Sequence, residues 1–118
     1  MTERPHKTLK LWGKTIDFIE DIYKISAKFP KEELYCLVSQ MRRAAISIAS
    51  NIAEGSARKG LHEKNQFYYI ARSSLSGLDA QLEISLRLKY TDTAEFKSLQ
   101  DKLDEISRML SGLIQSCE

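Results

Sequence analysis

Residues that interrupt helices are scarce in this sequence. Two prolines and five glycines among 118 residues leave long unbroken stretches, which favours helices over strands and tight turns. No run approaches the roughly 20 consecutive apolar residues that a membrane span needs. The first residues, MTERPHK, lack the hydrophobic core of a signal peptide. We therefore expect a cytoplasmic protein that does not contact the membrane.

Residues for metal binding and redox chemistry are equally scarce. Cys36 and Cys117 form neither a disulfide framework nor a metal-ligand spacing, so we expect buried or half-buried reduced thiols. His6 and His62 lie too far apart in the chain to suggest a metal site. The patterns GxxxxGK, GxGxxG, HExxH, GxSxG and CxxC do not occur. The sequence therefore predicts no cofactor, no metal and no enzymatic activity.

One pair of carboxylates needs separate consideration. Asp79 and Glu83 are one helical turn apart and could in principle act as acid and base or hold metals. Metal sites in helix bundles use Glu-x-x-His motifs on their helices, and none of the predicted helices contains one. Arg72 and Arg87 fall on the same helix face, so we expect surface ion pairs here instead.

Helical periodicity extends over most of the chain. Apolar residues recur every three or four positions in four segments, and we predict helices at about 8–28, 31–54, 61–89 and 93–117. Asp92 and Glu95 are spaced as a capping box for the last helix. Connections of about two to six residues favour antiparallel neighbours. The expected fold is all-α, with residues 1–118 forming one left-handed up-down-up-down four-helix bundle.

The helix at 31–54 is unusually rich in small side chains: Ala44, Ala45, Ala49 and Ala53. Small residues on several faces let neighbouring helices approach closely, so we expect this helix to be central and enclosed. We expect it to end where Glu54 and Gly55 provide a C-terminal break.

A polar line runs along the same helix and consists of Arg43, Ser47, Asn51 and Glu54. Such a line is usually a solvated face. If small apolar neighbours enclose it instead, its groups must form hydrogen bonds between helices, because burying an unpaired Arg or Asn is costly. The sequence leaves both interpretations open.

Apolar residues also form a second stripe on the first and third predicted helices. Long helices with a wide core would explain this pattern. Self-association explains it better, since monomeric proteins seldom expose large apolar patches, and closed cyclic assemblies are the commonest homo-oligomers.

Basic residues concentrate in the first half of the chain. Residues 1–64 hold 12 Lys and Arg against 8 Asp and Glu, whereas residues 65–118 hold 6 against 8. Six of these basic residues are expected at one end of the bundle, near the start of the first helix and the turn after the second: Lys7, Lys10, Lys14, Arg58, Lys59 and Lys64. Repeated around a ring, this end would form a positive rim suited to phosphate backbones.

The chain resembles the 23S rRNA intervening-sequence proteins, also called the four-helix bundle protein family. The resemblance rests on SQMRRAAISIASNIAEGSAR (39–58), FPKEELYCL (29–37) and IARSSLSGLDAQLEIS (70–85), with a weaker match in LKLWGKTIDFIEDIYKIS at the first helix. It implies a ring, typically a pentamer, with a basic rim or channel. A related branch, the accessory variability determinant proteins of diversity-generating retroelements, binds nucleic acid and partners a reverse transcriptase.

The resemblance also implies structural roles for Arg43, Asn51, Glu54 and Gly55, as an internal network and a helix end. The family pattern has Glu where this chain has Gly77, so Arg43 needs another partner, either Glu54 or Asp79. We predict a homo-oligomer that binds structured RNA. The alternative is a scaffold for protein partners that does not bind nucleic acid.

Overall fold

Four α-helices make up almost the whole molecule. The computed structural model describes residues 4–118, apart from the side chains of Lys7 and Thr8. The elements follow in the order η1 (Pro5–Thr8), α1 (Lys10–Ser26), η2 (Lys31–Glu33), α2 (Leu37–Ser56), α3 (Leu61–Arg87) and α4 (Thr93–Ser116). Within residues 4–118 there is no strand. The all-α prediction is confirmed.

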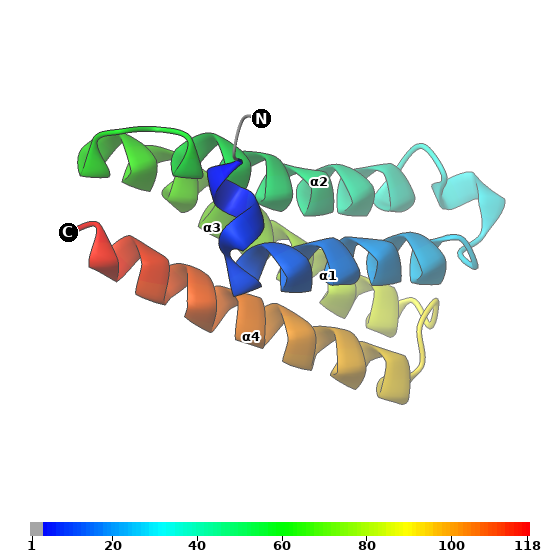
Figure 1. Cartoon of the computed structure of the whole chain (residues 1–118). Coiled ribbons are helices and arrows are strands. Elements are labelled where there is room, and N and C mark those ends of the chain that lie inside the picture. Colours follow the sequence, from blue (N-terminus) through cyan, green and yellow to red (C-terminus); the bar gives the residue numbers. More distant parts are fainter. Residues whose placement is uncertain (1–3) are drawn as a thin grey trace.

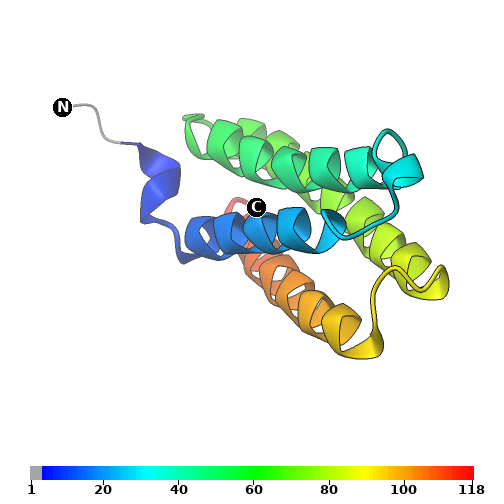
Figure 2. The same cartoon turned by 90° about the vertical axis from the view of Figure 1, so that its right-hand side faces the viewer.

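The helices pack as an up-down-up-down bundle (Figures 1 and 2). Each helix lies antiparallel to the one before it, and α4 returns to pack against α1. The bundle is elongated, with extents of 43 × 27 × 20 Å. The α1–α2 and α3–α4 connections lie at one end, and the α2–α3 turn and the C-terminus lie at the other. Residues far apart in the sequence therefore meet at each end.

The core is built from one stripe on each helix. On α4 the predicted stripe is confirmed, since Leu99, Leu103, Ile106 and Leu110 are at most 5% exposed. Large side chains from the other helices complete the fully buried centre, among them Phe18, Ile22, Met41, Ile48, Ile52, Tyr68, Leu75, Leu78 and Leu82. The second stripe of α3 is not part of this core.

The start of α2 differs from the prediction. Residues Lys31–Glu33 form a 3₁₀ turn, and α2 begins at Leu37 rather than near residue 31. The backbone of Cys36, at φ −121° and ψ −103°, is not helical and separates the two elements. Leu34, in this segment, is 46% exposed. Cys36 was expected to be buried or half-buried but is exposed for the same reason, whereas Cys117 is half-buried as expected; both are free thiols.

The end of α2 also differs from the prediction. Gly55 was expected to break the helix, but α2 continues to Ser56, and no described glycine has a positive φ. A Cβ atom on Gly55 would lie 2.6 Å from Cε1 of Tyr68 on α3. Glycine is needed here because α3 approaches the α2 backbone too closely for any side chain.

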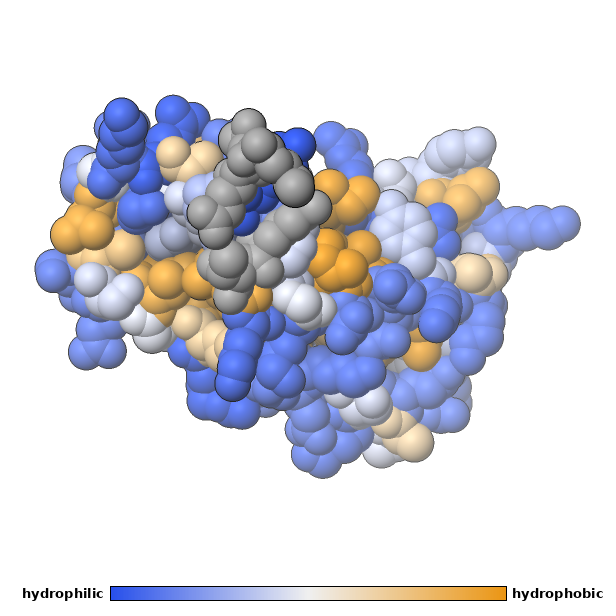
Figure 3. All heavy atoms as spheres, viewed as in Figure 1, coloured by the Kyte–Doolittle hydropathy of each residue, from blue (hydrophilic) through white to orange (hydrophobic). Residues whose placement is uncertain are grey.

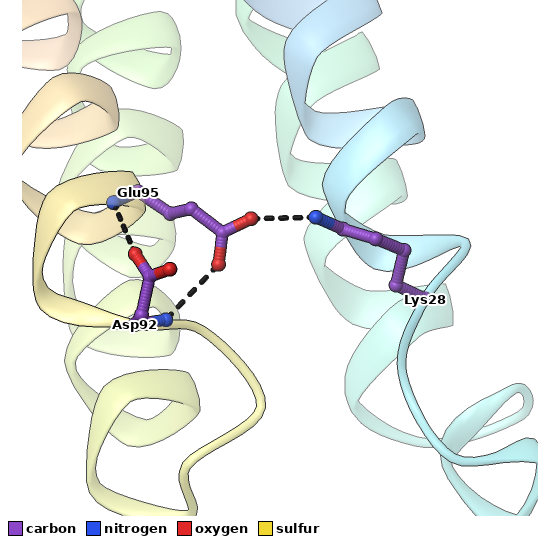
Figure 4. A network of polar contacts seen from close by, with 3 residues as sticks. All are labelled: Lys28, Asp92 and Glu95. Atoms are coloured by element: carbon purple, nitrogen blue, oxygen red, sulfur yellow. Dashed lines mark hydrogen bonds and ion pairs between the residues drawn. The ribbon is translucent and has the colours of Figure 1, made fainter.

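The α3–α4 connection has clear local signals. Lys89 follows α3 with φ 65°, the left-handed conformation common after a helix end. Asp92 then caps α4: its carboxylate accepts from the Glu95 backbone N–H at 2.7 Å, and the Glu95 carboxylate accepts from the Asp92 N–H at 3.0 Å (Figure 4). The predicted capping box is confirmed.

Candidate nucleic-acid interface

The start of the chain meets the α2–α3 turn and the end of α4 at one end of the bundle. A hollow of about 270 Å³ there is lined by residues from all three regions, including Pro5, Leu9, Ser56, Lys64 and Cys117. The first residues of α1 and the start of α3 are therefore neighbours. The six basic site residues were expected at this end of the bundle.

The two lysines at the start of α1 have different surroundings. Lys10 is exposed and forms no ion pair among the described side chains. Lys14 forms an ion pair with Glu105 on α4, with 2.7 Å between Nζ and Oε1. A lysine already paired with a carboxylate attracts phosphate less strongly, so Lys10 is the stronger candidate of the two.

The turn after α2 carries two exposed basic residues. Arg58 forms an ion pair with Glu54 at 3.0 Å, and its guanidinium lies 4.7 Å from the ring centroid of Phe67. Lys59 is exposed and forms no ion pair within the described region. Lys59 therefore carries the less neutralised charge at this turn.

Lys64 is half-buried and has a structural contact. Its Nζ donates to the carbonyl oxygen of Ser56 at 3.1 Å. Ser56 is the last residue of α2, so the ammonium lies at the negative end of that helix, where a cation is stabilising. A phosphate at this end would have to share Lys64 with the helix terminus.

The remaining candidate, Lys7, lies outside the described side chains. Arg4 was not among the predicted site residues but is exposed just before η1. Its position next to a proline, outside any periodic segment, gave no helical pattern from which to place it. The described candidates at this end are thus Lys10 and Lys59, supported by Arg58, Lys64 and Arg4.

Tyr68 anchors this end from inside. Its side chain is 2% exposed, and its hydroxyl and the Ser56 Oγ form a hydrogen bond of 3.1 Å. Burial raises the pKa of the Tyr68 phenol above its ordinary value, so it stays protonated at neutral pH. The contact holds the α2–α3 turn in place and is structural.

The predicted polar line on α2 separates into parts. Asn51 donates from Nδ2 to the Ser47 carbonyl and Oγ, and the Ser74 hydroxyl of α3 donates to the Ser47 Oγ at 2.8 Å. Glu54 pairs with Arg58 instead. Arg43 is exposed and forms no hydrogen bond or ion pair among the described residues. The four residues do not form one network.

The expected partners of Arg43 and of the α3 carboxylates are also different. Asp79 accepts a hydrogen bond from Gln100 on α4 at 3.1 Å, so it does not pair with Arg43. The guanidinium of Arg72 lies over the Tyr69 ring, at 4.7 Å from the centroid. The described residues contain no ion pair for Glu83 or Arg87. The surface ion pairs expected here are therefore not formed.

Metal-binding clusters and membrane-spanning helices are both lacking among the described residues. They contain no group of three or more His, Cys, Asp or Glu residues arranged to hold a metal ion. None of their helices is both long and apolar enough to cross a membrane.

The outer surface of α2 and α3 exposes several large apolar side chains. Ile46 is 45% exposed, and Ile70, Ile84 and Leu88 on α3 are 47–50% exposed. Gly77 lies midway between Ile70 and Ile84, and a Cβ there would meet no atom within 4 Å. The second apolar stripe of α3 is thus uncovered in the single chain.

Comparison with known proteins identified a family and a solved structure with a similar fold. The sequence profile described as 23S rRNA-intervening sequence protein matches residues 7–112. A solved structure of a protein of unknown function from the S23 ribosomal protein family of Bacteroides thetaiotaomicron superimposes with a TM-score of 0.82. That match covers 89% of this chain and 95% of the other at 21% identity, so it supports the fold. No curated protein is significantly similar to the chain.

Proposed function

Because the chain belongs to the 23S rRNA-intervening sequence protein family, we propose that it is a cytoplasmic, non-enzymatic homo-oligomer that binds structured RNA through its basic end. The family description names a ribosomal RNA insertion but no activity. The assembly we propose is a ring, with a pentamer as the expected form. Each subunit would then contribute its basic end to a shared rim.

The observation that carries this proposal is the meeting of separate basic segments at one end of the bundle. Lys10, Lys59 and Arg4 are exposed. They lie within two residues of Leu9, Leu61 and Pro5, which line the hollow that joins the chain start to the α2–α3 turn. Few charges from one subunit give weak binding to a polyanion. A ring multiplies them, and each phosphate neutralised adds counterion release to the binding free energy.

Self-association is supported by the apolar side chains left exposed on separate surfaces. Ile70 and Ile84 lie on α3, whereas Leu34 and Tyr35 lie on the α1–α2 connection. In the view of Figure 3, hydrophobic residues gather between α1 and α2 and near the C-terminal end of α4, whereas hydrophilic ones dominate over the first part of α4. Heterologous contacts, in which two different surfaces meet, generate closed rings when the rotation permits.

The test compares two pairs of lysines at opposite ends of the molecule. The variant Lys10→Gln/Lys59→Gln removes two charges at the basic end. The control Lys31→Gln/Lys97→Gln removes two at the other end. We expect the first variant to weaken binding to 23S rRNA fragments and to reduce the salt slope of log K by about two for each subunit that contacts the RNA, in gel-shift titrations at several salt concentrations. The control should bind like the unmodified protein.

The oligomeric mass is measured on the same samples by light scattering. A protein that shows no shift at low salt, or equal losses in both variants, would contradict RNA binding through this end. An oligomer that fails to bind RNA but retains a protein partner after nuclease treatment would support the scaffold function. A particle of 13.5 kDa at micromolar concentration would contradict the ring.

A further inference from the structure

Two hydrophobic side chains project into solvent from the connection between α1 and α2. Tyr35 is 89% exposed and Leu34 is 46% exposed, and we call this pair the connector knob. Both lie in the turn between η2 and α2, so they belong to no helix stripe. Tyr35 contributes little to the core of its own chain. Tyrosine is among the residues enriched at protein interfaces.

A hollow of about 560 Å³ lies between the second half of α1 and the first half of α4. Ile25 and Leu99 supply its apolar lining, and Ala94 and Ser98 keep the α4 side shallow. We call this hollow the α1–α4 groove. Its volume falls within the range of sites that take up bulky apolar groups.

The charges beside the knob and the groove are complementary. Lys24 lines the groove and has no ion pair or hydrogen bond among the described residues. The other groove lysines, Lys28 and Lys102, are paired with Glu95 and Asp21. Glu32, which is exposed, lies two residues before the connector knob. Opposite charges at the edge of a contact fix its register and favour association.

The α1–α2 connection, which carries the knob, lies at the same end of the bundle as the second half of α1 and the first half of α4, which line the groove (Figure 1). Tyr35 is 89% exposed, so it does not fill the groove of its own chain. If the ring axis is parallel to the long axis of each bundle, the contacting surfaces of neighbouring copies lie at the same height along that axis. Two different surfaces at one height suit such a heterologous contact.

We propose that the connector knob of one copy docks in the α1–α4 groove of the next copy. Tyr35 and Leu34 would cover the apolar lining, and Glu32 would face Lys24. This inference rests on the proposed self-association and locates its interface. It is independent of whether the opposite, basic end binds RNA.

The test uses Cys36, the exposed thiol next to Tyr35. In a Cys117→Ser background, Ser98→Cys adds one thiol in the groove. We expect a short bismaleimide to link Cys36 to residue 98 of the neighbour and give a ladder of covalent multimers on a denaturing gel. The matched control is Ser111→Cys, an exposed serine on the same helix about 20 Å away. It should give no ladder beyond the background.

The outcomes separate this inference from the proposed function. An oligomer by light scattering without a ladder from Ser98→Cys would overturn the docking and leave the self-association standing. Dimers alone, linked through Cys36 in the background protein, would indicate a symmetric contact and also overturn it. A monomeric background protein would overturn both.

Charge reversal provides a second, independent measurement. We expect Lys24→Glu and Glu32→Lys each to raise the dissociation constant of the oligomer, and the double variant to recover most of the loss. Tyr35→Ala should weaken association about tenfold or more, as is typical when a central aromatic is truncated. All three residues are exposed, so the chain should still fold. Unchanged association in Tyr35→Ala would overturn the docking.

Discussion

The α2–α3 seam and the α1–α4 seam of this bundle are held together in opposite ways. Between α2 and α3 the backbones come so close that Gly55 has no room for a Cβ beside Tyr68. Short side chains suffice to bond across this seam, as in the 2.8 Å hydrogen bond between Ser47 and Ser74. Between α1 and α4 there is a groove of about 560 Å³.

Long charged side chains cross the α1–α4 seam instead. Three ion pairs follow one another along it: Lys14–Glu105, Asp21–Lys102 and Lys28–Glu95. Figure 4 shows the last of these, with the Lys28 side chain extended from the end of α1 toward Glu95 at the start of α4. All three pairs are partly exposed, and such pairs contribute little to stability.

The two seams therefore differ in how much added side-chain volume they can tolerate. Burial and close packing in the α2–α3 seam leave little tolerance for added volume. The α1–α4 seam leaves a hollow of about 560 Å³ beside the core. Three measurements test this contrast, and the expected effect on stability decreases from the first to the third.

The largest effect is expected from a single methyl group in the close seam. Gly55→Ala gains helix propensity of about 1 kcal/mol, but the new Cβ overlaps a ring that is 98% buried and hydrogen-bonded to Ser56. Since overpacking costs about 1–3 kcal/mol, we expect a net loss of up to about 2 kcal/mol in the free energy of unfolding. Urea denaturation followed by circular dichroism measures it.

The matched control is the same substitution in open space. Gly77→Ala places its methyl group where no atom lies within 4 Å, on the exposed face of α3. We expect it to raise the free energy of unfolding by about 0.5–1 kcal/mol, because alanine is the better helix former. Equal effects of both substitutions would mean that α2 and α3 are not as close at Gly55 as the structure indicates.

A smaller effect is expected from the hydroxyl contact across the same seam. Ser74→Ala removes the donor to Ser47 and should cost about 0.5–1.5 kcal/mol. A double-mutant cycle with Ser47→Ala isolates the coupling between the two hydroxyls. Ser73→Ala, on the exposed side of the same helix, should be nearly neutral. A zero coupling energy would show that packing alone holds this part of the seam.

Periodicity was enough to predict the four helices and most of the core. The stripe from Leu99 to Leu110 predicted the buried face of α4 because its spacing depends only on the chain itself. The small residues of α2 also predicted a close seam, and Ala45 is fully buried and Ala49 nearly so. Sequence patterns within one helix thus predict which of its residues are buried when the packing partner is the apolar face of another helix. The expectation that α2 is enclosed on several faces is wrong for the single chain, because Ala44 and Ala53 are only half-buried and Ile46 is 45% exposed.

Features that depend on a specific partner were not predictable. The sequence around Gly55 indicates a helix end. The structural need for glycine comes instead from the ring of Tyr68, which lies 13 residues away on another helix. The segment KEELYC consists largely of good helix formers, yet η2 and the backbone at Cys36 delay the start of α2. Ion pairs across the α1–α4 seam join charges up to 91 positions apart, at Lys14 and Glu105. Spacing within one helix contains no information about such partners.

The smallest effect is expected in the open seam and is a dependence on pH. A hydrogen bond from Lys28, assisted by the backbone N–H of Asp92, holds the pKa of the Glu95 carboxyl below its ordinary value of 4.5. The same contact raises the pKa of Lys28 above 10.5. The pair therefore stabilises the fold at neutral pH. This contribution is lost as pH falls through the lowered pKa of Glu95, and also as pH rises through the raised pKa of Lys28.

Glu95→Gln isolates this contribution, because glutamine can still accept the Asp92 N–H in the capping box while lacking the charge. We expect the variant to be slightly less stable than the unmodified protein at pH 7 and equal to it once the pH is below the lowered pKa of Glu95, with thermal melting as the measurement. Asp101→Asn is the control, since its pair with Lys97 lies within α4 and crosses no seam. A constant difference between Glu95→Gln and the unmodified protein at every pH would assign the effect to packing, and the α1–α4 seam would then be held by the same forces as the other.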